Sequence, residues 1–409
     1  MSAQNNNKAF CVLPWVHLYI EPSGDVFTCC LKDEKAQPLG NINEQAVSDV
    51  WNSEGLKQVR LDFLNGKKRA DICNLCYQQE ASGSFSHRVH YNQKFLPLVE
   101  EQIHSLTKED GHFDQFKLFY WDFRFSNICN LKCRTCGPIY SSSWYSDAKE
   151  LGSYDPSKKL LDRKDKFEFL THHIEHVEEI YFAGGEPLLM EEHYKILNLL
   201  LEKNRLNVKL SYNSSCNNIN YKGQSITEYW KHFTNVVLSP SIDHFGKKSE
   251  IMRSGSRWDD VVNNIKKIQQ ETPHVFIHPT ITVSNMNILD LPEVLLEFDR
   301  EGLINLDNQD KLTFNILRTP EYFHVGMLSD DLKIKAIYKL KSFEAFLKEK
   351  RNIKLQDFSS IYAALGIDFG QEKKNFLDIT SKLDSLRGEN FFETFSELKN
   401  LDGSSGDEK

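Results

Sequence analysis

The sequence lacks long apolar runs and an excess of positive charge. No stretch approaches the roughly 18 consecutive apolar residues of a membrane span, and the N-terminal MSAQNNNKAF has no basic region followed by an apolar segment of signal length. The 50 Lys and Arg residues against 58 Asp and Glu leave a formal charge of -8, which argues against a general affinity for nucleic-acid backbones. We therefore expect a cytoplasmic protein with no membrane partner and no general nucleic-acid binding.

Structural disulfides are not expected either, because the cytosol keeps thiols reduced. The chain nevertheless has nine cysteines, which call for another explanation. They are clustered rather than scattered, and this clustering indicates metal binding. Five lie early in the chain, three form a tight trio and one stands alone: Cys11, Cys29, Cys30, Cys73 and Cys76; Cys129, Cys133 and Cys136; and Cys216.

The middle of the chain alternates short β-rich runs with helical patterns, the signature of βα units around a parallel sheet. Right-handed crossovers would curl these units into an α/β fold, a partial (β/α)6 barrel of the TIM type. The clearest helix spans 256–270, where apolar residues recur at helical spacing behind Ser256 as the N-cap. The six predicted strands are 117–126, 177–184, 207–214, 235–243, 274–283 and 311–318.

The chain is longer than a single hydrophobic core usually supports, so we expect one large domain with smaller additions. The predicted order is a cysteine-rich module, a helical linker, the barrel, a helical C-terminal region and a disordered tail. The predicted boundaries are 1–83, 84–117, 118–320, 321–401 and 402–409.

Cys129, Cys133 and Cys136 follow directly after the first predicted barrel strand. This spacing lets one loop wrap around a cubic cluster and supply thiolates to three of its four irons. The fourth iron then stays open and can chelate a small molecule that bears an amine and a carboxylate, as a catalytic metal keeps one open position. Zinc is the alternative, but a zinc site normally wants a fourth Cys or His nearby, and the flanking GPIYSSSW offers neither.

The spacing Cys129-x3-Cys133-x2-Cys136 after a β-strand resembles the cluster loop of the radical S-adenosylmethionine (radical SAM) superfamily. The resemblance implies a [4Fe-4S] cluster whose open iron binds the amine and carboxylate of S-adenosylmethionine. One electron then splits the sulfonium into methionine and a 5′-deoxyadenosyl radical, which abstracts a substrate hydrogen. The resemblance also implies a reductase, or a flavodoxin or ferredoxin, as the electron donor.

Glycine and polar residues at later strand ends resemble the superfamily's S-adenosylmethionine site. The run Gly184-Gly185-Glu186-Pro187 is similar to the GGEP-type motif, in which glycines admit the methionine moiety and a carboxylate pairs with its ammonium. Asn213 lies where the family often has a Thr-Asn-Gly run. Ser241 and Asp243 resemble the family's Ser-Ile-Asp-Gly strand, whose polar groups meet the ligand at the end of a barrel strand.

Further polar residues are candidates for the same region. Arg253 resembles the family arginine that approaches the methionine carboxylate, since a bidentate guanidinium suits that group. Asn285 or Asn287 could play a similar polar role. Candidates near the substrate are Asp122, Arg124, His278 and Arg318 on predicted strands, and Cys216 after the third strand.

The early cysteines resemble the cluster-binding module called twitch, a shortened form of the SPASM module. The matching residues are Cys11, the hairpin turn at Gly24, Cys29 and the knuckle Cys73-Asn-Leu-Cys76, whose four thiolates would close a second, auxiliary [4Fe-4S] cluster. Zinc is the alternative, because four cysteines with one C-x2-C suit a tetrahedral site equally well. Cys30 could replace Cys29 as ligand, but the Gly-x4-Cys spacing favours Cys29. In familiar members this module follows the barrel, whereas here it precedes it.

The sequence leaves the reaction and the substrate open. A second cluster fits an oxidation, in which the substrate radical passes its electron to that cluster. It fits a bond formation or rearrangement equally well. Peptides are frequent substrates of SPASM enzymes, but no winged-helix-like leader-binding module is evident, so a peptide or protein residue and a small metabolite are both candidates. A non-catalytic zinc-binding interaction protein is the hypothesis from another class.

Overall fold

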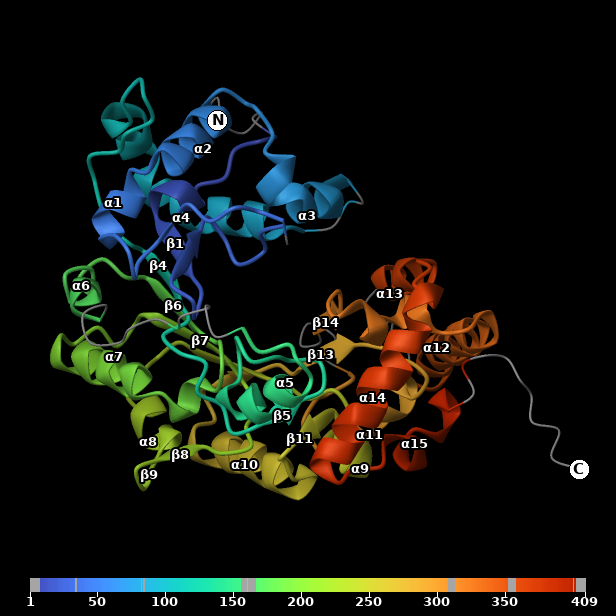
Figure 1. Ribbon diagram of the computed structural model, residues 1–409. Helices are drawn as coiled ribbons and strands as arrows, with labels where there is room; N and C mark the ends of the chain where they lie inside the picture. The colour runs from blue at the N-terminus through green and yellow to red at the C-terminus, as the bar shows by residue number, and fades with distance from the viewer. Residues whose placement is uncertain are drawn as a thin grey trace, which may run out of the picture. The chain divides into compact units, whose positions relative to one another are not determined.

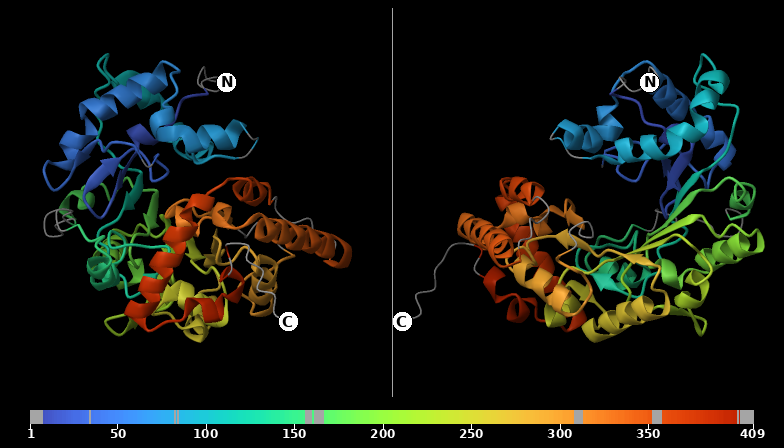
Figure 2. Two further views of the ribbon diagram at one scale, coloured as in Figure 1. Left: turned by 45° about the vertical axis from the view of Figure 1, so that its right-hand side comes forward. Right: turned by 180° about the vertical axis from the view of Figure 1, so that it is seen from behind.

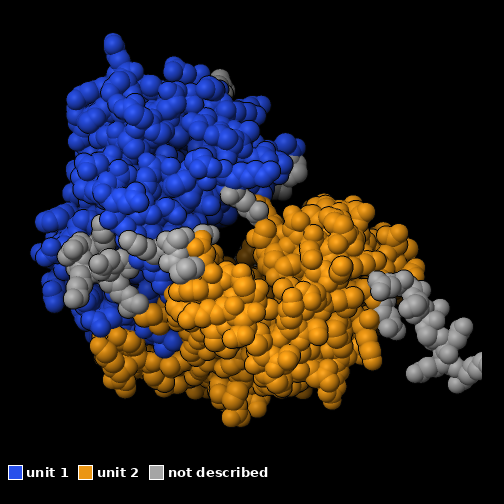
Figure 3. Space-filling model, in the orientation of Figure 1, with its two compact units in different colours: residues 1–127, 156–211, 232–235 blue, residues 128–155, 212–231, 236–409 orange. Residues whose placement is uncertain are grey.

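The computed structural model describes residues 8–33, 35–81, 83, 85–155, 160, 167–307, 313–351, 358–399 and 401. The chain divides into two compact units, which are coloured separately in Figure 3. Unit 1 takes in 1–127, 156–211 and 232–235, and unit 2 takes in 128–155, 212–231 and 236–409. Each unit therefore contains part of the predicted barrel region. The predicted tail, 402–409, lies outside the described residues.

Unit 1 is built on strands in the order β7-β6-β4-β1-β2-β3. β1 runs parallel to β4 and β4 parallel to β6, while β1 and β2 form an antiparallel hairpin. The predicted hairpin turn is confirmed, and Gly24 there has a φ of +87° that favours glycine. The strands are β1 (His17–Ile20), β2 (Asp25–Phe27), β3 (Gly40–Asn41), β4 (Tyr120–Phe123), β6 (Glu179–Phe182) and β7 (Lys209–Ser214), whose last residues belong to unit 2.

The N-terminal hairpin is continuous with the first predicted barrel strand. His17 lies opposite Tyr120 in the β1–β4 pair, and Tyr19 lies opposite Asp122. The two rings of the first pair stack with centroids 4.3 Å apart, and His17 Nδ1 lies 3.0 Å from the backbone oxygen of Tyr120. The predicted cysteine-rich module therefore contributes its first strand to the same sheet as the first predicted barrel strand, which the sequence did not indicate.

Helices surround the N-terminal hairpin of unit 1 (Figures 1 and 2). α2 and α4 begin at serine caps, because Ser53 Oγ accepts the Leu56 amide and Ser86 Oγ accepts the Val89 amide. The helices of this unit are α1 (Val47–Trp51), α2 (Glu54–Leu64), α3 (Ala70–Ala81), α4 (His87–Leu106), α6 (Glu168–Thr171) and α7 (Glu191–Glu202), with short 3-10 turns at η2 (Leu13–Trp15) and η4 (Pro187–Leu189).

Unit 2 contains the later predicted strands, paired two by two. β10 (Val236–Pro240) runs parallel to β12 (Phe276–Ile277), and β13 (Thr280–Val283) runs parallel to β14 (Thr313–Ile316). The single strand predicted over 274–283 is therefore wrong, since the structure divides it into two strands. Pro279 lies between them and has no amide with which to continue a ladder.

Two further pairs complete the strands of unit 2. β5 (Lys132–Cys133) pairs antiparallel with β11 (Arg253–Ser254). β8 (Asn220–Tyr221) and β9 (Gln224–Ser225) form a short antiparallel ribbon. The β5–β11 pair joins the loop that carries Cys129, Cys133 and Cys136 to the segment that carries Arg253.

Unit 2 also contains most of the helices, and α12 to α15 lie together on one side of it (Figures 1 and 2). They are α5 (Tyr145–Glu150), α8 (Ile226–Trp230), α9 (Gly246–Met252), α10 (Trp258–Glu271), α11 (Leu291–Arg300), α12 (Asp330–Arg351), α13 (Ser359–Leu365), α14 (Lys373–Arg387) and α15 (Phe391–Thr394), with short turns that include η3 (Ser142–Trp144) and η9 (Ser396–Leu398).

The helix predicted over 256–270 exists as α10, but its predicted cap is wrong. Arg257 occupies the N-cap position and makes no side-chain capping bond. The Ser256 amide instead donates to the Arg253 carbonyl at 2.9 Å, so this serine closes the turn after β11. The predicted apolar stripe is confirmed, because its members are buried: Trp258, Val261, Val262, Ile265 and Ile268.

The mixed α/β fold with its central parallel strands confirms the predicted fold class, consistent with a partial TIM-like barrel, and the C-terminal region is helical as predicted. Among the described residues, no helix has the length and apolarity needed to cross a membrane.

Candidate active site

The loop that carries Cys129, Cys133 and Cys136, the cluster loop, is held by its own neighbours in unit 2. Ser143 Oγ donates to the Cys129 carbonyl at 2.8 Å, and the Trp144 indole donates to the Cys133 carbonyl at 3.0 Å. Because both donors lie on η3, the turn that follows the loop fixes the loop at two of its three cysteines.

The three thiols of the cluster loop are partly exposed, and donors point at two of the sulfurs. The Leu131 amide donates to Cys129 Sγ at 3.4 Å, and Arg253 Nη1 donates to Cys133 Sγ at 3.7 Å. Burial, followed by the neighbouring Cys133 and Cys129, raises the pKa of Cys136 to about 12. The three sulfurs therefore interact electrostatically with one another and would release protons on binding iron.

Arg253 is the charged link between the cluster loop and the end of β10. Its Nε and Nη2 donate to Asp243 Oδ2 at 3.0 and 2.6 Å. The other oxygen, Asp243 Oδ1, accepts the Thr282 amide at 2.8 Å. Burial lowers the pKa of Arg253, but the negative charges of Asp243 and Cys133 outweigh burial and raise that pKa above its usual value. The guanidinium therefore stays charged. Predicted cofactor-binding residues thus lie together with a predicted cluster ligand.

Asn287 braces the same strand end. Its Nδ2 donates to the carbonyls of Asp243 and Thr282 at 3.0 and 2.9 Å, and its Oδ1 accepts the Ser284 amide at 2.9 Å. Asn285 donates instead to the Tyr322 carbonyl at 3.1 Å. Both side chains are buried and hydrogen-bonded to backbone, so they hold loops in place.

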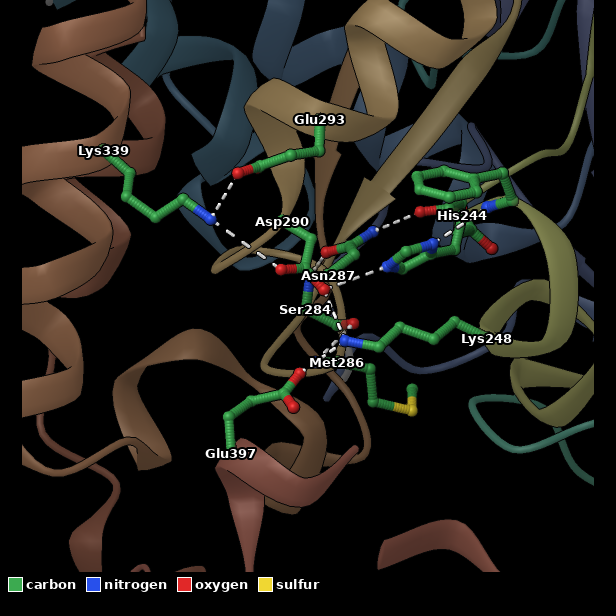
Figure 4. Close-up of polar contacts among 11 residues, drawn as sticks. His244, Lys248, Ser284, Met286, Asn287, Asp290, Glu293, Lys339 and Glu397 are labelled. Carbon is green, nitrogen blue, oxygen red and sulfur yellow. Dashed lines mark hydrogen bonds and ion pairs between the residues drawn. The ribbon is translucent and has the colours of Figure 1, made fainter. Parts of the chain in front are cut away.

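A charged network surrounds Asp290 beside this strand end (Figure 4). Asp290 Oδ2 lies 3.3 Å from His244 Nε2 and 2.5 Å from Lys248 Nζ, which also contacts Glu397 Oε1 at 2.6 Å. Lys339 on α12 pairs with Glu293 at 2.7 Å. Burial raises the pKa of Asp290, but the hydrogen bonds from His244 and Lys248 outweigh it and hold that pKa well below its usual range.

The GGEP-type run lies in unit 1, directly after β6. Gly184 has a φ of +116°, which favours glycine, although a Cβ there would lie at an ordinary contact distance of 3.4 Å from the Arg124 Cδ atom. Glu186 is buried, and its Oε1 accepts the Leu188 amide at 3.3 Å as the cap of η4. The carboxylate is thus held at the end of the barrel strand.

Asp122 and Arg124 form a buried ion pair at the end of β4. Arg124 Nε lies 2.8 Å from Asp122 Oδ1, and the guanidinium lies 5.6 and 4.9 Å from the ring centroids of Tyr19 and Tyr181. Burial raises the pKa of Asp122, against the charge of Arg124 and a hydrogen bond with Cys30. Two predicted substrate-side candidates therefore lie together, next to an early cysteine.

The early cysteines fall into two groups within unit 1. Burial, then the neighbouring Cys73, raises the pKa of Cys11, and burial followed by Cys76 raises that of Cys73 to about 12. A hydrogen bond with Cys29, followed by burial, raises the pKa of Cys30. Electrostatic interactions thus connect Cys11 with Cys73 and Cys76, and a hydrogen bond joins Cys29 to Cys30.

Backbone amides point at several of these early sulfurs. The Leu13 amide bonds to Cys11 and the Leu31 amide donates to Cys29 Sγ at 3.4 Å, each from two residues further along the chain. The same geometry occurs at Cys129 in the cluster loop. Such donors stabilise thiolates that hold an iron–sulfur cluster. The early cysteines and the cysteines of the cluster loop therefore both fit that cofactor. Among the described residues no three Cys, His, Asp or Glu side chains are arranged to hold a single metal ion.

The remaining predicted residues have diverse places in unit 2. Ser241 is half-buried and its amide donates to the Ser214 carbonyl at 2.8 Å, while Asn213 is half-buried on β7. His278 lies between β12 and β13 and bonds to Ser239 Oγ at 2.9 Å. Arg318 is exposed beyond β14, and Cys216 is buried with a φ of +54°.

Two further charged residues, which the sequence did not point to, hold the cluster loop: Arg134 lies within it, between Cys133 and Cys136, and Asp147 lies on α5 after it. Arg134 is buried and pairs with Asp384 and Glu389, and Asp147 is buried and pairs with Lys132 and Arg387. An arginine directly after a candidate ligand cysteine was the available signal, but its distant partners leave no local pattern.

Comparison with protein families matches residues 123–295 to the radical SAM superfamily and residues 11–77 to SPASM, an iron–sulfur cluster-binding domain. A search of curated proteins found no match.

Solved structures provide a second comparison. Native anSMEcpe with bound AdoMet and a Cp18Cys peptide aligns at 16% identity and a TM-score of 0.39, covering 58% of this chain and 61% of that protein. SuiB of Streptococcus suis, bound to its precursor peptide SuiA, aligns at 15% identity and a TM-score of 0.38, covering 74% and 64%. This chain spans less than two thirds of either protein's length.

Proposed function

This chain belongs to the radical SAM superfamily, with an SPASM domain ahead of its radical SAM domain, and from that premise we propose that it is an oxidoreductase or maturase-like enzyme acting on a peptide, a protein residue or a small metabolite. The observation that carries the proposal is the cluster loop, with three partly exposed cysteines and a charged arginine directed at one sulfur. We place the enzyme in the cytoplasm, with a flavodoxin, ferredoxin or reductase as electron donor.

The radical SAM domain implies a [4Fe-4S] cluster and S-adenosylmethionine. When bound, these cofactors supply a 5′-deoxyadenosyl radical that removes a hydrogen atom from the substrate. Cys129, Cys133 and Cys136 would hold the cluster. Arg253 is kept beside Cys133 by Asp243, where its guanidinium is suited to a carboxylate such as that of the methionine moiety.

The other proposed cofactor contacts come from strand ends. Glycine at 184 leaves room for close approach of a ligand to the backbone, and Glu186 offers a buried carboxylate. The complete proposed set is Gly184, Gly185, Glu186, Pro187, Asn213, Ser241, Asp243 and Arg253.

The SPASM domain implies auxiliary iron–sulfur binding. We assign Cys11, Cys29, Cys73 and Cys76 as its ligands. Cys29 is preferred to Cys30 because its sulfur accepts a backbone amide, as Cys129 does, whereas Cys30 bonds to Asp122. Within the proposed domain boundaries, 1–83 and 118–320, Asp122 and Arg124 then lie close to Cys30, the residue that follows the proposed ligand Cys29.

Metal analysis tests this function against a zinc-binding interaction protein. We expect anaerobic reconstitution to give a brown protein with about eight irons per chain, as two cubic clusters require, and reductive cleavage of S-adenosylmethionine to methionine and 5′-deoxyadenosine. The same protein as purified, before reconstitution, serves as the control. A colourless protein with stoichiometric zinc, no iron and no cleavage would overturn the proposal.

A further inference from the structure

The family matches end at residue 295, and no comparison assigns a role to the C-terminal helices that follow. α14 supplies partners for Arg134, which lies between Cys133 and Cys136. Arg134 is buried, pairs with Asp384 and donates from Nη2 to Glu389 Oε2 at 2.6 Å.

The end of α14 is shaped so that both acids reach Arg134. Gly388 ends the helix in the left-handed region, with a φ of +64°. The chain therefore turns back, and the Glu389 amide donates to the Asp384 carbonyl at 3.1 Å. Asp384 is fixed from its own side as well, because its Oδ2 accepts the Phe391 amide at 2.8 Å.

A second contact joins α14 to the residues just after the cluster loop. Asp147 on α5 accepts from Lys132 Nζ at 2.7 Å and from Arg387 Nε at 2.8 Å. The Arg387 guanidinium also lies 4.7 Å from the ring centroid of Trp144, whose indole donates to the Cys133 carbonyl. Taken together, the first and second contacts contain three cations and three carboxylates, and their formal charges cancel.

A third contact ties the C-terminal region to the strand ends of the site (Figure 4). Lys248 bridges Asp290 and Glu397, and Lys339 on α12 pairs with Glu293. Asp290 belongs to the same network as His244, which directly follows Asp243. The C-terminal helices thus contact both the cluster loop and the segment that holds Arg253.

Stability alone does not account for these buried ion pairs, because apolar residues of similar volume often stabilise a fold as well or better. Charged pairs fix one relative position, since each partner left alone would be a buried unpaired charge. We propose that Asp384, Arg387 and Glu389, the C-terminal latch, are positioning residues that hold the cluster loop in the one arrangement that presents its three sulfurs to the cluster and S-adenosylmethionine. This inference rests on the proposed function.

Matched substitutions on α14 and in the turn that follows it test the latch. Asp384→Asn with Glu389→Gln removes both charges opposite Arg134. Asp378→Asn is the control, because Asp378 lies on the same helix and forms an exposed pair with Lys382 at 2.7 Å. Hydrogen–deuterium exchange of the metal-free protein reads the loop directly, since the Arg134 amide is protected by the Met252 carbonyl at 2.8 Å.

We expect the double variant to exchange the amides of 132–136 about tenfold faster than the parent chain, with the rest of unit 2 and the control unchanged. After reconstitution, its Kd for S-adenosylmethionine should rise about tenfold, and the change that S-adenosylmethionine causes in the electron paramagnetic resonance spectrum of the reduced cluster should weaken. If the double variant does not fold, Glu389→Gln alone retains one carboxylate opposite Arg134 and should show a smaller acceleration.

Unchanged loop exchange, or acceleration spread evenly over unit 2, would overturn the latch while leaving the proposed function intact. Faster loop exchange in a chain whose parent binds no iron would instead overturn the proposed function.

Discussion

The two cysteine groups of this protein are held by different kinds of contact. In unit 2, Cys129, Cys133 and Cys136 are all partly exposed, and the loop that carries them is surrounded by buried ion pairs. In unit 1, Cys11 and Cys76 are buried, while Cys29, Cys30 and Cys73 are partly exposed. The donors to the buried pair are mainly backbone: the Leu13 amide bonds to Cys11, and the Arg88 amide, together with the Ser86 hydroxyl, bonds to Cys76.

This difference teaches how the two groups would divide their work. A site that meets an exchanging small molecule needs access, and its charged surroundings hold the open geometry in place. A site with some fully buried ligands, such as Cys11 and Cys76, suits a group that stays bound and passes electrons. Helical spacing serves the second purpose well, because Cys73 and Cys76 on α3 are three residues apart and lie on one face.

The largest effect should follow loss of a cluster-loop ligand. In Cys133→Ala the loop keeps only two thiols and Arg253 loses the sulfur that it contacts, so cleavage of S-adenosylmethionine should fall by about 100-fold or more. Chromatography of 5′-deoxyadenosine from the reconstituted, reduced enzyme measures it. Full activity in this variant would refute the assignment of the trio.

Loss of an early cysteine ligand should distinguish the role of the early cysteines from the role of the cluster loop. Cys76→Ala removes a buried sulfur of unit 1 but leaves the cluster loop unchanged, so cleavage of S-adenosylmethionine should continue while substrate turnover falls about tenfold or more. The two rates, measured on the same preparation, check the division. Equal loss of both would show that the early cysteines serve the cleavage step as well.

The smallest effect is expected at Cys30, which provides the sharpest matched pair. Cys29→Ser should lower the iron content from about eight to about four per chain. The auxiliary cluster needs a fourth thiolate ligand, and a serine hydroxyl replaces it poorly. Cys30→Ser should retain about eight irons, since Cys30 bonds to Asp122. Iron and sulfide analysis distinguishes them, and the reverse pattern would make Cys30 the ligand.

Local patterns predicted much of the fold from the sequence. The strands now seen as β4, β6, β7 and β10 lie within their predicted runs, and the apolar stripe of α10 followed from helical periodicity. The predicted single strand over 274–283 failed because the missing amide of Pro279 outweighed the β-rich composition around it. The Ser256 cap failed because that residue closes the preceding turn.

In the candidate site, too, local patterns were visible in the sequence and long-range contacts were not. Cysteine spacing pointed to both groups of thiols, whose ligand roles stay predictions. Contacts between distant segments had no signal in a single sequence. His17 meets Tyr120 across 103 residues, and Arg134 meets Asp384 across 250. Such pairs are selected by three-dimensional packing, so neither residue type nor periodicity identifies the partner.

The pairing of β1 with β4 bears on how separable the parts of this protein are. Since β1 occupies one edge of β4 over four residue pairs, a chain without its N-terminal hairpin would leave that edge unpaired, and an exposed strand edge invites association with other chains. The N-terminal hairpin, which lies within the SPASM match, is therefore a structural part of the sheet that contains β4. Moving this N-terminal segment to another protein would leave β4 without its neighbouring strand unless another strand replaced β1.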